Sequence, residues 1–184
     1  MTHRQQWILI AAFASIIGGA LWAGVLFFSD EFKQVTVGSR APRFSAVTLD
    51  PVPRTRTLAD YKGEVMLVNI WATWCPPCER EMPMLQSIHE QYRAKGLRLV
   101  AVSTDAPGME NAIRSFVKKY GLTFDVLYDP EARIMQDYMT PAQPESFIIG
   151  RDGVIRYKQV AAITDRDAVQ IRALLEQLLA ERGN

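Results

Sequence analysis

The sequence is poor in cysteine and has no excess of either charge, and both shortages restrict what the protein can do. Two of its 184 residues are cysteine, which is too few for the disulfide framework of a small secreted protein. Lysine and arginine total 21 against 20 for aspartate and glutamate, so no field of one sign points to nucleic acid as a partner. The two cysteines, Cys75 and Cys78, lie three positions apart and form either one site or a chance pair.

Charged residues are missing altogether from one long stretch near the N-terminus. Residues 7–28 form an apolar run of 22 residues, and a helix of that length, rising about 1.5 Å per residue, spans roughly 33 Å. A histidine and an arginine precede the run, whereas Asp30 and Glu31 follow it, which favours an exported C-terminal part. We therefore expect residues 1–6 in the cytoplasm and residues 7–28 as a single-pass signal anchor in the inner membrane.

A cleaved signal peptide is the alternative for this segment, because residues 18–20 (Gly-Gly-Ala) offer a small-residue cleavage site. Cleavage there would leave residues 21–28 as an apolar new N-terminus, which favours the uncleaved anchor. Residues 29–40 are polar and aperiodic, so we expect a linker there and a folded domain over residues 41–184. The domain is expected on the periplasmic or extracytoplasmic side of the membrane.

The expected domain alternates strand-like and helix-like segments. Residues 65–71 and 97–103 are near-continuous apolar runs, typical of strands that are buried on both faces of a sheet. Residues 79–95 and 109–120 follow them with apolar positions at helical spacing, and each ends at a glycine. The other expected elements are a hairpin over 44–57, a strand at 124–127, a helix at 131–138, a hairpin over 146–159 and a helix at 167–181. This order predicts an α/β domain with a mixed central sheet flanked by helices.

Both cysteines lie where a strand ends and a helix begins, in the stretch W-A-T-W-C-P-P-C. Cys75 therefore sits beside unpaired N–H groups of the first helical turn, which stabilise a thiolate and lower the thiol pKa from about 8.5. We expect Cys75 to attack a disulfide and Cys78, one turn further on, to resolve the mixed disulfide. Pro76 and Pro77 stiffen the intervening turn and bear on its redox potential. Trp74 is expected on the active surface, where clients would bind.

A C-x-x-C pair also occurs as a passive disulfide or as half of a zinc site. Zinc requires four ligands, and His89, in the middle of the following helix, is the other soft candidate in the exported part. No metal site is therefore expected. Trp71, at the end of the preceding strand, is expected in the core.

A second element lies at Gln143-Pro144-Glu145-Ser146, directly before an apolar strand. Because proline cannot donate to a sheet ladder, Pro144 marks the start of that strand. A cis bond before Pro144 would turn the chain toward the helix that carries the cysteines, and the spacing alone leaves cis and trans open.

The stretch W-A-T-W-C-P-P-C, Pro83 in the following helix, and the block Q-P-E-S-F-I-I-G-R-D-G-V-I are similar to those of the thioredoxin superfamily. More narrowly, the chain resembles the membrane-tethered TlpA/ResA and CcmG/DsbE proteins of bacterial cytochrome c maturation, over roughly residues 38–160. The resemblance implies a thioredoxin fold with an N-terminal hairpin and an extra αβ insertion within residues 97–127, preceded by one transmembrane helix. It also implies that Pro144 is the cis-proline opposite Cys75.

The resemblance adds two acidic candidates. Glu81 and Glu145 fall where these proteins carry acidic residues near the active site, so both are candidates for tuning the pKa of either cysteine, the alternative being ordinary surface charges. Asn69 occupies the place where cytoplasmic thioredoxins have a buried acid. Gln143 replaces the small or apolar residue that usually precedes the cis-proline, and residues 139–142 replace a glycine-containing loop, which leaves the client open.

Together these features predict an extracytoplasmic thiol-disulfide oxidoreductase with no cofactor beyond its own redox-active dithiol. The expected clients are exported proteins with a dithiol or disulfide, apocytochrome c first, and a membrane electron donor would reduce the enzyme again. The alternatives are a reductase for copper-site assembly, a general disulfide oxidant, a thiol peroxidase and a copper-binding module. Thr73 and Cys75 do not match the T-x-x-C pattern of peroxidases, and copper binding lacks a nearby methionine or histidine cluster.

Overall fold

The computed structural model describes residues 3–28 and 35–181, which belong to two separate units. The first unit is helix α1 (His3–Phe28), and the apolar side chains that the structure describes in it are exposed, Trp22 by 70%. The stretch His3–Gly24 is long and apolar enough to cross a membrane, which makes α1 a candidate for the span expected over residues 7–28. Residues 1–2 of the expected cytoplasmic segment and residues 29–34 of the expected linker lie outside the described residues.

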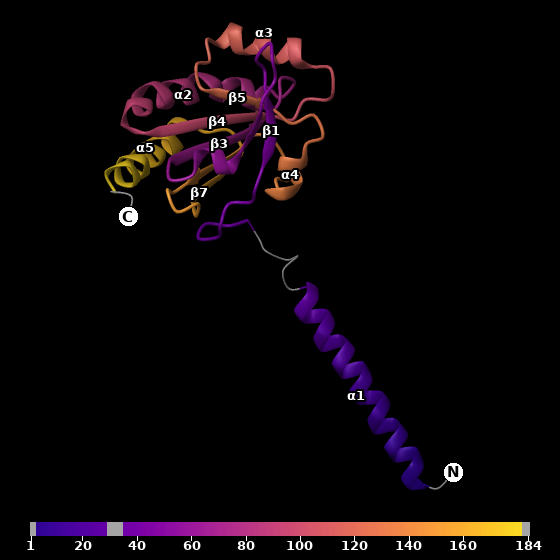
Figure 1. The fold of residues 1–184 in the computed structure, drawn as a ribbon. Coiled ribbons are helices and arrows are strands. Elements are labelled where there is room, and N and C mark those ends of the chain that lie inside the picture. Colours follow the sequence, from indigo (N-terminus) through magenta and orange to yellow (C-terminus); the bar gives the residue numbers. More distant parts are fainter. Residues whose placement is uncertain (1–2, 29–34, 182–184) are drawn as a thin grey trace. The chain divides into compact units, whose positions relative to one another are not determined.

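The second unit is built on a seven-stranded sheet with the order β2-β1-β5-β4-β3-β6-β7, and Figure 1 shows β5, β4 and β3 side by side in it. β3 (Val65–Trp71), β4 (Leu97–Ser103) and β5 (Asp125–Tyr128) are parallel neighbours in its middle. β6 (Glu145–Ile149) runs antiparallel to β3, and β7 (Ile155–Val160) runs antiparallel to β6. The mixed sheet predicted from the sequence is confirmed.

The predicted leading hairpin extends one edge of this sheet. β1 (Ser45–Thr48) and β2 (Thr55–Thr57) are antiparallel, and β1 pairs with β5. A short 3-10 helix, η1 (Leu58–Tyr61), then leads into β3. The hairpin therefore lies beyond β5, away from β3, which is the strand that leads to the cysteines.

The folded part begins earlier than the expected boundary at Ala41. Val35 is buried, the N–H of Gly38 donates to the carbonyl of Ile155 at 2.8 Å, and the N–H of Ile155 donates to the carbonyl of Ser39 at 2.9 Å. Residues 35–40, which were expected in the linker, thus belong to the folded part, and residues 38–40 pair with the start of β7 and the residue before it. The sequence did not predict this pairing, because it uses backbone groups and does not depend on a side-chain pattern.

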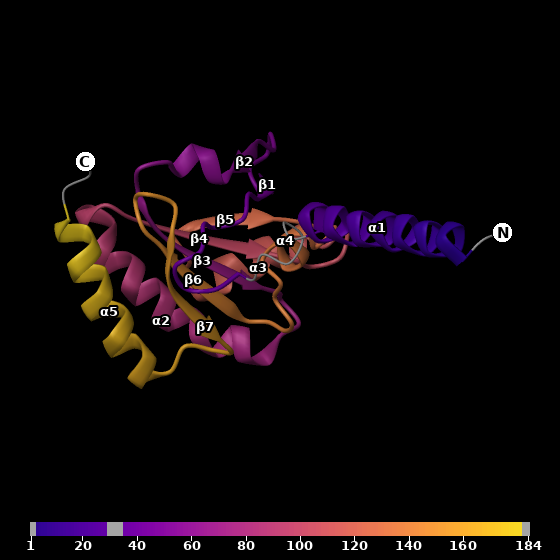
Figure 2. The ribbon, with the colours of Figure 1, turned by 90° about the horizontal axis from the view of Figure 1, so that it is seen from below.

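Helices cover both faces of the sheet. α2 (Pro76–Tyr92), α3 (Glu110–Tyr120) and α5 (Asp165–Ala180) pack on one face, and Figure 2 shows α2 and α5 next to one another. The short α4 (Arg133–Asp137) packs on the other face. Another 3-10 turn, η2 (Arg93–Lys95), ends the α2 segment at the expected glycine.

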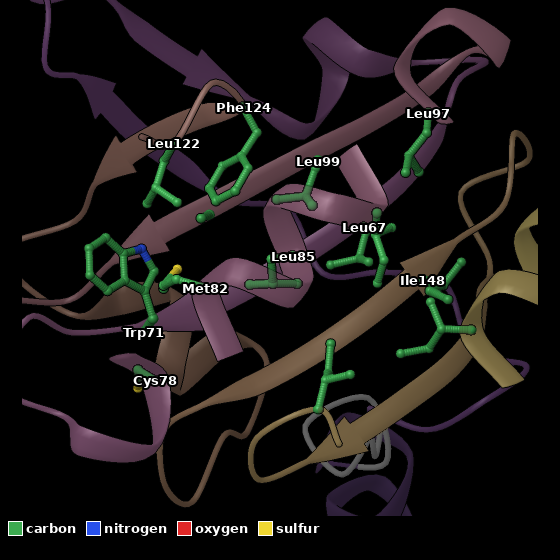
Figure 3. Close-up of a cluster of buried hydrophobic side chains, with 14 of the residues drawn as sticks. Leu67, Trp71, Cys78, Met82, Leu85, Leu97, Leu99, Leu122, Phe124 and Ile148 are labelled. Carbon is green, nitrogen blue, oxygen red and sulfur yellow. The ribbon is translucent and has the colours of Figure 1, made fainter. Parts of the chain in front are cut away.

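The core has two layers because successive side chains of a strand point to opposite faces. Leu67 and Trp71 of β3 join the cluster beneath α2, whereas the residues between them, apart from Asn69, join the cluster on the other face. Figure 3 shows Trp71, Met82 and Cys78 at one end of the first cluster. The redox pair thus borders a buried layer, and the prediction that Trp71 is a core residue is confirmed.

Candidate functional site

A disulfide joins Cys75 and Cys78 at the start of α2, with the two Cα atoms 5.2 Å apart. Cys75 is the N-cap residue of α2, and the N–H of Cys78 donates to Cys75 Sγ at 3.2 Å. The strand-to-helix turn therefore places the sulfur of Cys75 at the helix N-terminus, as the sequence predicted. Cys78 is fully buried and Cys75 is 4% exposed, so both residues are buried in the disulfide form and Cys75 is the less enclosed of the two.

The residues around the pair fit the geometry expected of the turn. Pro76 and Pro77 are the first two residues of α2, where a missing N–H leaves no helical bond unmade. Trp74, directly before Cys75, is 67% exposed. Trp74 thus lies on the surface as expected, and its contact with clients stays a prediction.

Asp105, which sequence reasoning missed, holds the loop before Cys75. The N–H of Thr73 donates to Asp105 Oδ2 at 3.0 Å, the hydroxyl of Thr73 donates to Oδ1 at 2.6 Å, and the hydroxyl of Ser103 donates to Oδ2 at 2.7 Å. The Asp105 side chain is fully buried. A signal was present in the sequence: a polar triplet, Ser-Thr-Asp, begins at the last residue of a buried strand whose carboxyl end meets that of its parallel neighbour β3.

Glu81 is buried on the side of Cys78. Asn69 Nδ2 donates to Glu81 Oε1 at 2.8 Å, and the N–H of Ile163 donates to Oε2 at 2.9 Å. Burial raises the pKa of Glu81 to about 7, against the effect of these two donors. The alternative of an ordinary surface charge is therefore wrong for Glu81, which sits one helical turn after Cys78.

Glu145 is also buried, but on the opposite face of the sheet. Lys158 Nζ lies 3.1 Å from Glu145 Oε1, so the alternative of an ordinary surface charge is wrong here as well. The next residue of β6, Ser146, accepts a hydrogen bond from Asn69 at 3.0 Å, on the face where Glu81 lies. Because neighbouring side chains of a strand point to opposite faces, the structure does not bring Glu81 and Glu145 together.

The segment before β6 lies against the end of β4. The peptide bond between Gln143 and Pro144 is cis, as the resemblance implied. Gln143 Nε2 donates to Thr104 Oγ1, and the N–H of Thr104 donates to the carbonyl of Trp71 at 2.9 Å. Residues 103–105 therefore contact both the loop before the cysteines and the loop before the cis-proline.

The expected absence of a metal and of a further cofactor stays a prediction. His89 packs edge-on against the ring of Phe124, with centroids 5.9 Å apart. Within residues 3–28 and 35–181, no group of three or more His, Cys, Asp or Glu side chains is arranged to hold a metal ion. The group of the described site that can carry electrons is the cysteine pair itself.

Known proteins are similar to this chain over most of its length. Residues 37–158 match the AhpC/TSA family. The thiol-disulfide oxidoreductase ResA of Bacillus cereus is 35% identical over 157 residues, covering 85% of this chain and 87% of that protein. The thioredoxin-like protein YneN of Bacillus subtilis is 33% identical over 167 residues, covering 90% and 96%. A thiol:disulfide interchange protein DsbE structure from Chlorobium tepidum aligns with a TM-score of 0.71 and 27% identity, over 79% of this chain and 99% of that one.

Proposed function

Because the chain belongs to the AhpC/TSA family of thioredoxin-like proteins, on the branch of ResA and DsbE, we propose that its thiol-disulfide oxidoreductase activity resides in Cys75 and Cys78 and reduces exported clients. The observation that supports this most is the place of the pair. Cys75 caps the N-terminus of α2 and is 4% exposed, while Cys78 is fully buried. A helix N-terminus favours the thiolate, which is the species that attacks disulfides.

The proposed reaction moves two electrons and two protons from the dithiol to the client. The Cys75 thiolate attacks one sulfur of the client disulfide, a bond forms between Cys75 and that sulfur, and the other client sulfur leaves as a thiolate and takes up a proton. Cys78 then loses its proton and attacks Cys75 Sγ. The bond between Cys75 and Cys78 forms, and the second client sulfur leaves and is protonated.

We assign Glu81 as the group that accepts the proton of Cys78. The two residues are three positions apart in α2, so they lie on the same face of the helix. A carboxyl group whose burial raises its pKa to about 7 accepts and releases a proton with little cost at neutral pH. Its carboxylate would take the Cys78 proton during resolution and return it when the dithiol is regenerated.

The cellular setting that we propose is a domain tethered by α1 to the outer face of the inner membrane, in the periplasm or its equivalent. The charges that flank the apolar run favour this orientation. A tether would hold the domain near a membrane electron donor. Apocytochrome c is the proposed client because the chain resembles the branch that serves cytochrome c maturation, with a copper-site protein as the alternative.

The test uses the full chain with Cys78→Ala, in which a mixed disulfide on Cys75 has no resolving thiol. We expect it to form a stable adduct with an oxidised apocytochrome peptide that carries the haem-binding cysteines. Cys75→Ala is the matched control and should form none. A peptide from a copper-site protein, offered in competition, should be captured more slowly.

Two results would separate the parts of this proposal. Faster capture of the copper-site peptide would overturn the apocytochrome assignment and leave the chemistry intact. Adduct formation by Cys75→Ala, but not by Cys78→Ala, would overturn the roles of the two cysteines. Rapid consumption of hydrogen peroxide or copper retained after purification would instead support the peroxidase or the copper-binding alternative.

A further inference from the structure

We propose that Asp105 is a positioning residue of the redox site, which holds Thr73 and thereby fixes the sulfur of Cys75 against the N-terminus of α2. The inference rests on the proposed function, because it concerns how Cys75 is made ready to attack. Asp105 itself has no role in bond making, and it acts through the loop that it binds.

The contacts of Asp105 converge on the start of the cysteine loop. Thr73 gives both its backbone N–H and its hydroxyl to the carboxyl group, at 3.0 and 2.6 Å. Ser103 contacts Asp105 twice: its hydroxyl donates to the carboxyl group at 2.7 Å and accepts the backbone N–H of Asp105 at 3.2 Å. Hydrogen bonds that use both the backbone and the side chain of one residue restrict its position and its orientation, so Thr73 has little freedom to move.

A single residue, Trp74, separates Thr73 from Cys75, and its exposed ring does not anchor the turn by burial. Within the turn, the N–H of Cys75 donates to the carbonyl of Ala72 at 3.3 Å. The position of Cys75 Sγ therefore depends on where Thr73 is held. Sγ accepts the N–H of Cys78 at 3.2 Å, and a shift of the turn would weaken this contact and the stabilisation of the thiolate.

The segment that carries Asp105 also binds the other loop of the site. Thr104 donates its N–H to the carbonyl of Trp71 at 2.9 Å, and its hydroxyl oxygen accepts a hydrogen bond from Gln143 Nε2. Gln143 directly precedes Pro144. The end of β4 is thus a common support for the two segments between which a client would approach Cys75, and Asp105 is the residue there that binds Thr73.

If Asp105 acted only through its charge, Asp105→Asn would shift the pKa of Cys75 in the direction opposite to the shift that loss of loop support would cause. A carboxylate near a thiolate disfavours ionisation, so removing its charge would lower the pKa of Cys75. Removing the support of the loop would instead raise the pKa of Cys75, because the thiolate loses its place at the helix N-terminus. The direction in which the pKa of Cys75 changes therefore tells whether Asp105 acts by holding the loop or by its charge.

The experiment measures alkylation of Cys75 by iodoacetamide against pH, in the full chain with the Cys78→Ala background, where Cys75 is the single thiol. We expect both Asp105→Asn and Thr73→Val to raise the apparent pKa of Cys75 and to slow alkylation at pH 7 by about three- to tenfold. Thr73→Val keeps the carboxyl group in place, so it still decides the question if Asp105→Asn fails to fold. Asp165→Asn, an exposed aspartate in the first turn of α5, is the matched control and should leave the profile unchanged.

Two results would overturn the inference. One is a profile within twofold of the background in both variants. The other is faster alkylation in Asp105→Asn with no change in Thr73→Val, which would assign a charge effect alone. Failure of the proposed function would look different, because Cys75 in the otherwise unsubstituted chain would then not exchange with any disulfide client.

Discussion

A buried carboxyl group lies on each side of the disulfide, Asp105 on the side of Cys75 and Glu81 on the side of Cys78. The two groups receive different numbers of hydrogen bonds. Among the described residues, three groups from Thr73 and Ser103 donate to Asp105, on the side of Cys75. Two groups donate to Glu81, on the side of Cys78, and burial raises its pKa to about 7. The comparison shows that Asp105 is placed to hold the loop before Cys75, whereas Glu81, whose pKa is raised by burial, can exchange a proton at neutral pH.

The strongest way to separate the two sides is to remove each sulfur in turn. Cys75→Ala should abolish reduction of insulin by dithiothreitol through this protein, because the attacking thiolate is gone. Cys78→Ala should also stop turnover, but it should still attack once and accumulate as a mixed disulfide. Non-reducing electrophoresis checks this. Turnover by Cys75→Ala comparable to that of the unsubstituted chain would contradict the assignment.

Glu81→Gln should remove a pH dependence of stability that the buried Glu81 gives the unsubstituted chain. The pKa of Glu81 is raised in the folded protein from an ordinary 4.5 to about 7, so its contribution is complete below pH 4.5 and is lost as the pH rises through 7. Between these limits the unsubstituted chain should lose roughly 3 kcal/mol that Glu81→Gln does not lose.

The measurement for Glu81→Gln is urea unfolding of both oxidised proteins from pH 4 to 8, with the cysteines in their disulfide. The free energy of unfolding of the variant, minus that of the unsubstituted chain, should increase with pH. A difference that stays flat would show that Glu81 has an ordinary pKa.

Asn69→Ala tests the contribution of one hydrogen-bond donor to Glu81. Asn69 supplies one of the two hydrogen bonds to Glu81, so its loss should raise the pKa of Glu81 further and cost about 1–3 kcal/mol of stability. The cost should be larger at pH 8, where the carboxyl group is ionised, than at pH 5. Equal costs at the two pH values would show that the lost contact is unrelated to the charge of Glu81.

Ser103→Ala is the counterpart for Asp105 and should have the smallest effect. It removes one of three donor groups and leaves both groups of Thr73 in place, so we expect a loss of about 1 kcal/mol. Urea unfolding of the oxidised protein at pH 7 measures it. A cost above that of Asn69→Ala at pH 8 would reverse the ranking of the two sides.

The sequence predicted the fold well because local patterns determine most of it. The apolar run of β3 and the helical spacing of Met82 and Leu85 on α2 are signals within one element, and both are confirmed. The place of Cys75 at a strand-to-helix turn followed from the same signals. α4 differs from the prediction, because its five residues fall inside the longer helix expected over residues 131–138.

The features that the sequence did not predict depend on partners far away in the chain. Asp105 binds Thr73 across 32 positions, and one donor to Glu81 is Ile163, 82 positions away. The pairing of Gly38 with Ile155 uses backbone groups, which leave no pattern in the side chains. Burial of Glu81 also breaks the usual rule that glutamate lies at the surface, as functional sites often do.

The most direct test of the account is the order in which the two thiols of the reduced, unsubstituted chain react. Brief alkylation at a series of pH values, followed by fragmentation mass spectrometry of the peptide that contains both cysteines, gives the rate for each thiol. We expect Cys75 to be modified faster than Cys78 at and below pH 7, because Cys75 caps α2 and Cys78 is fully buried. Faster modification of Cys78 under the same conditions would contradict it.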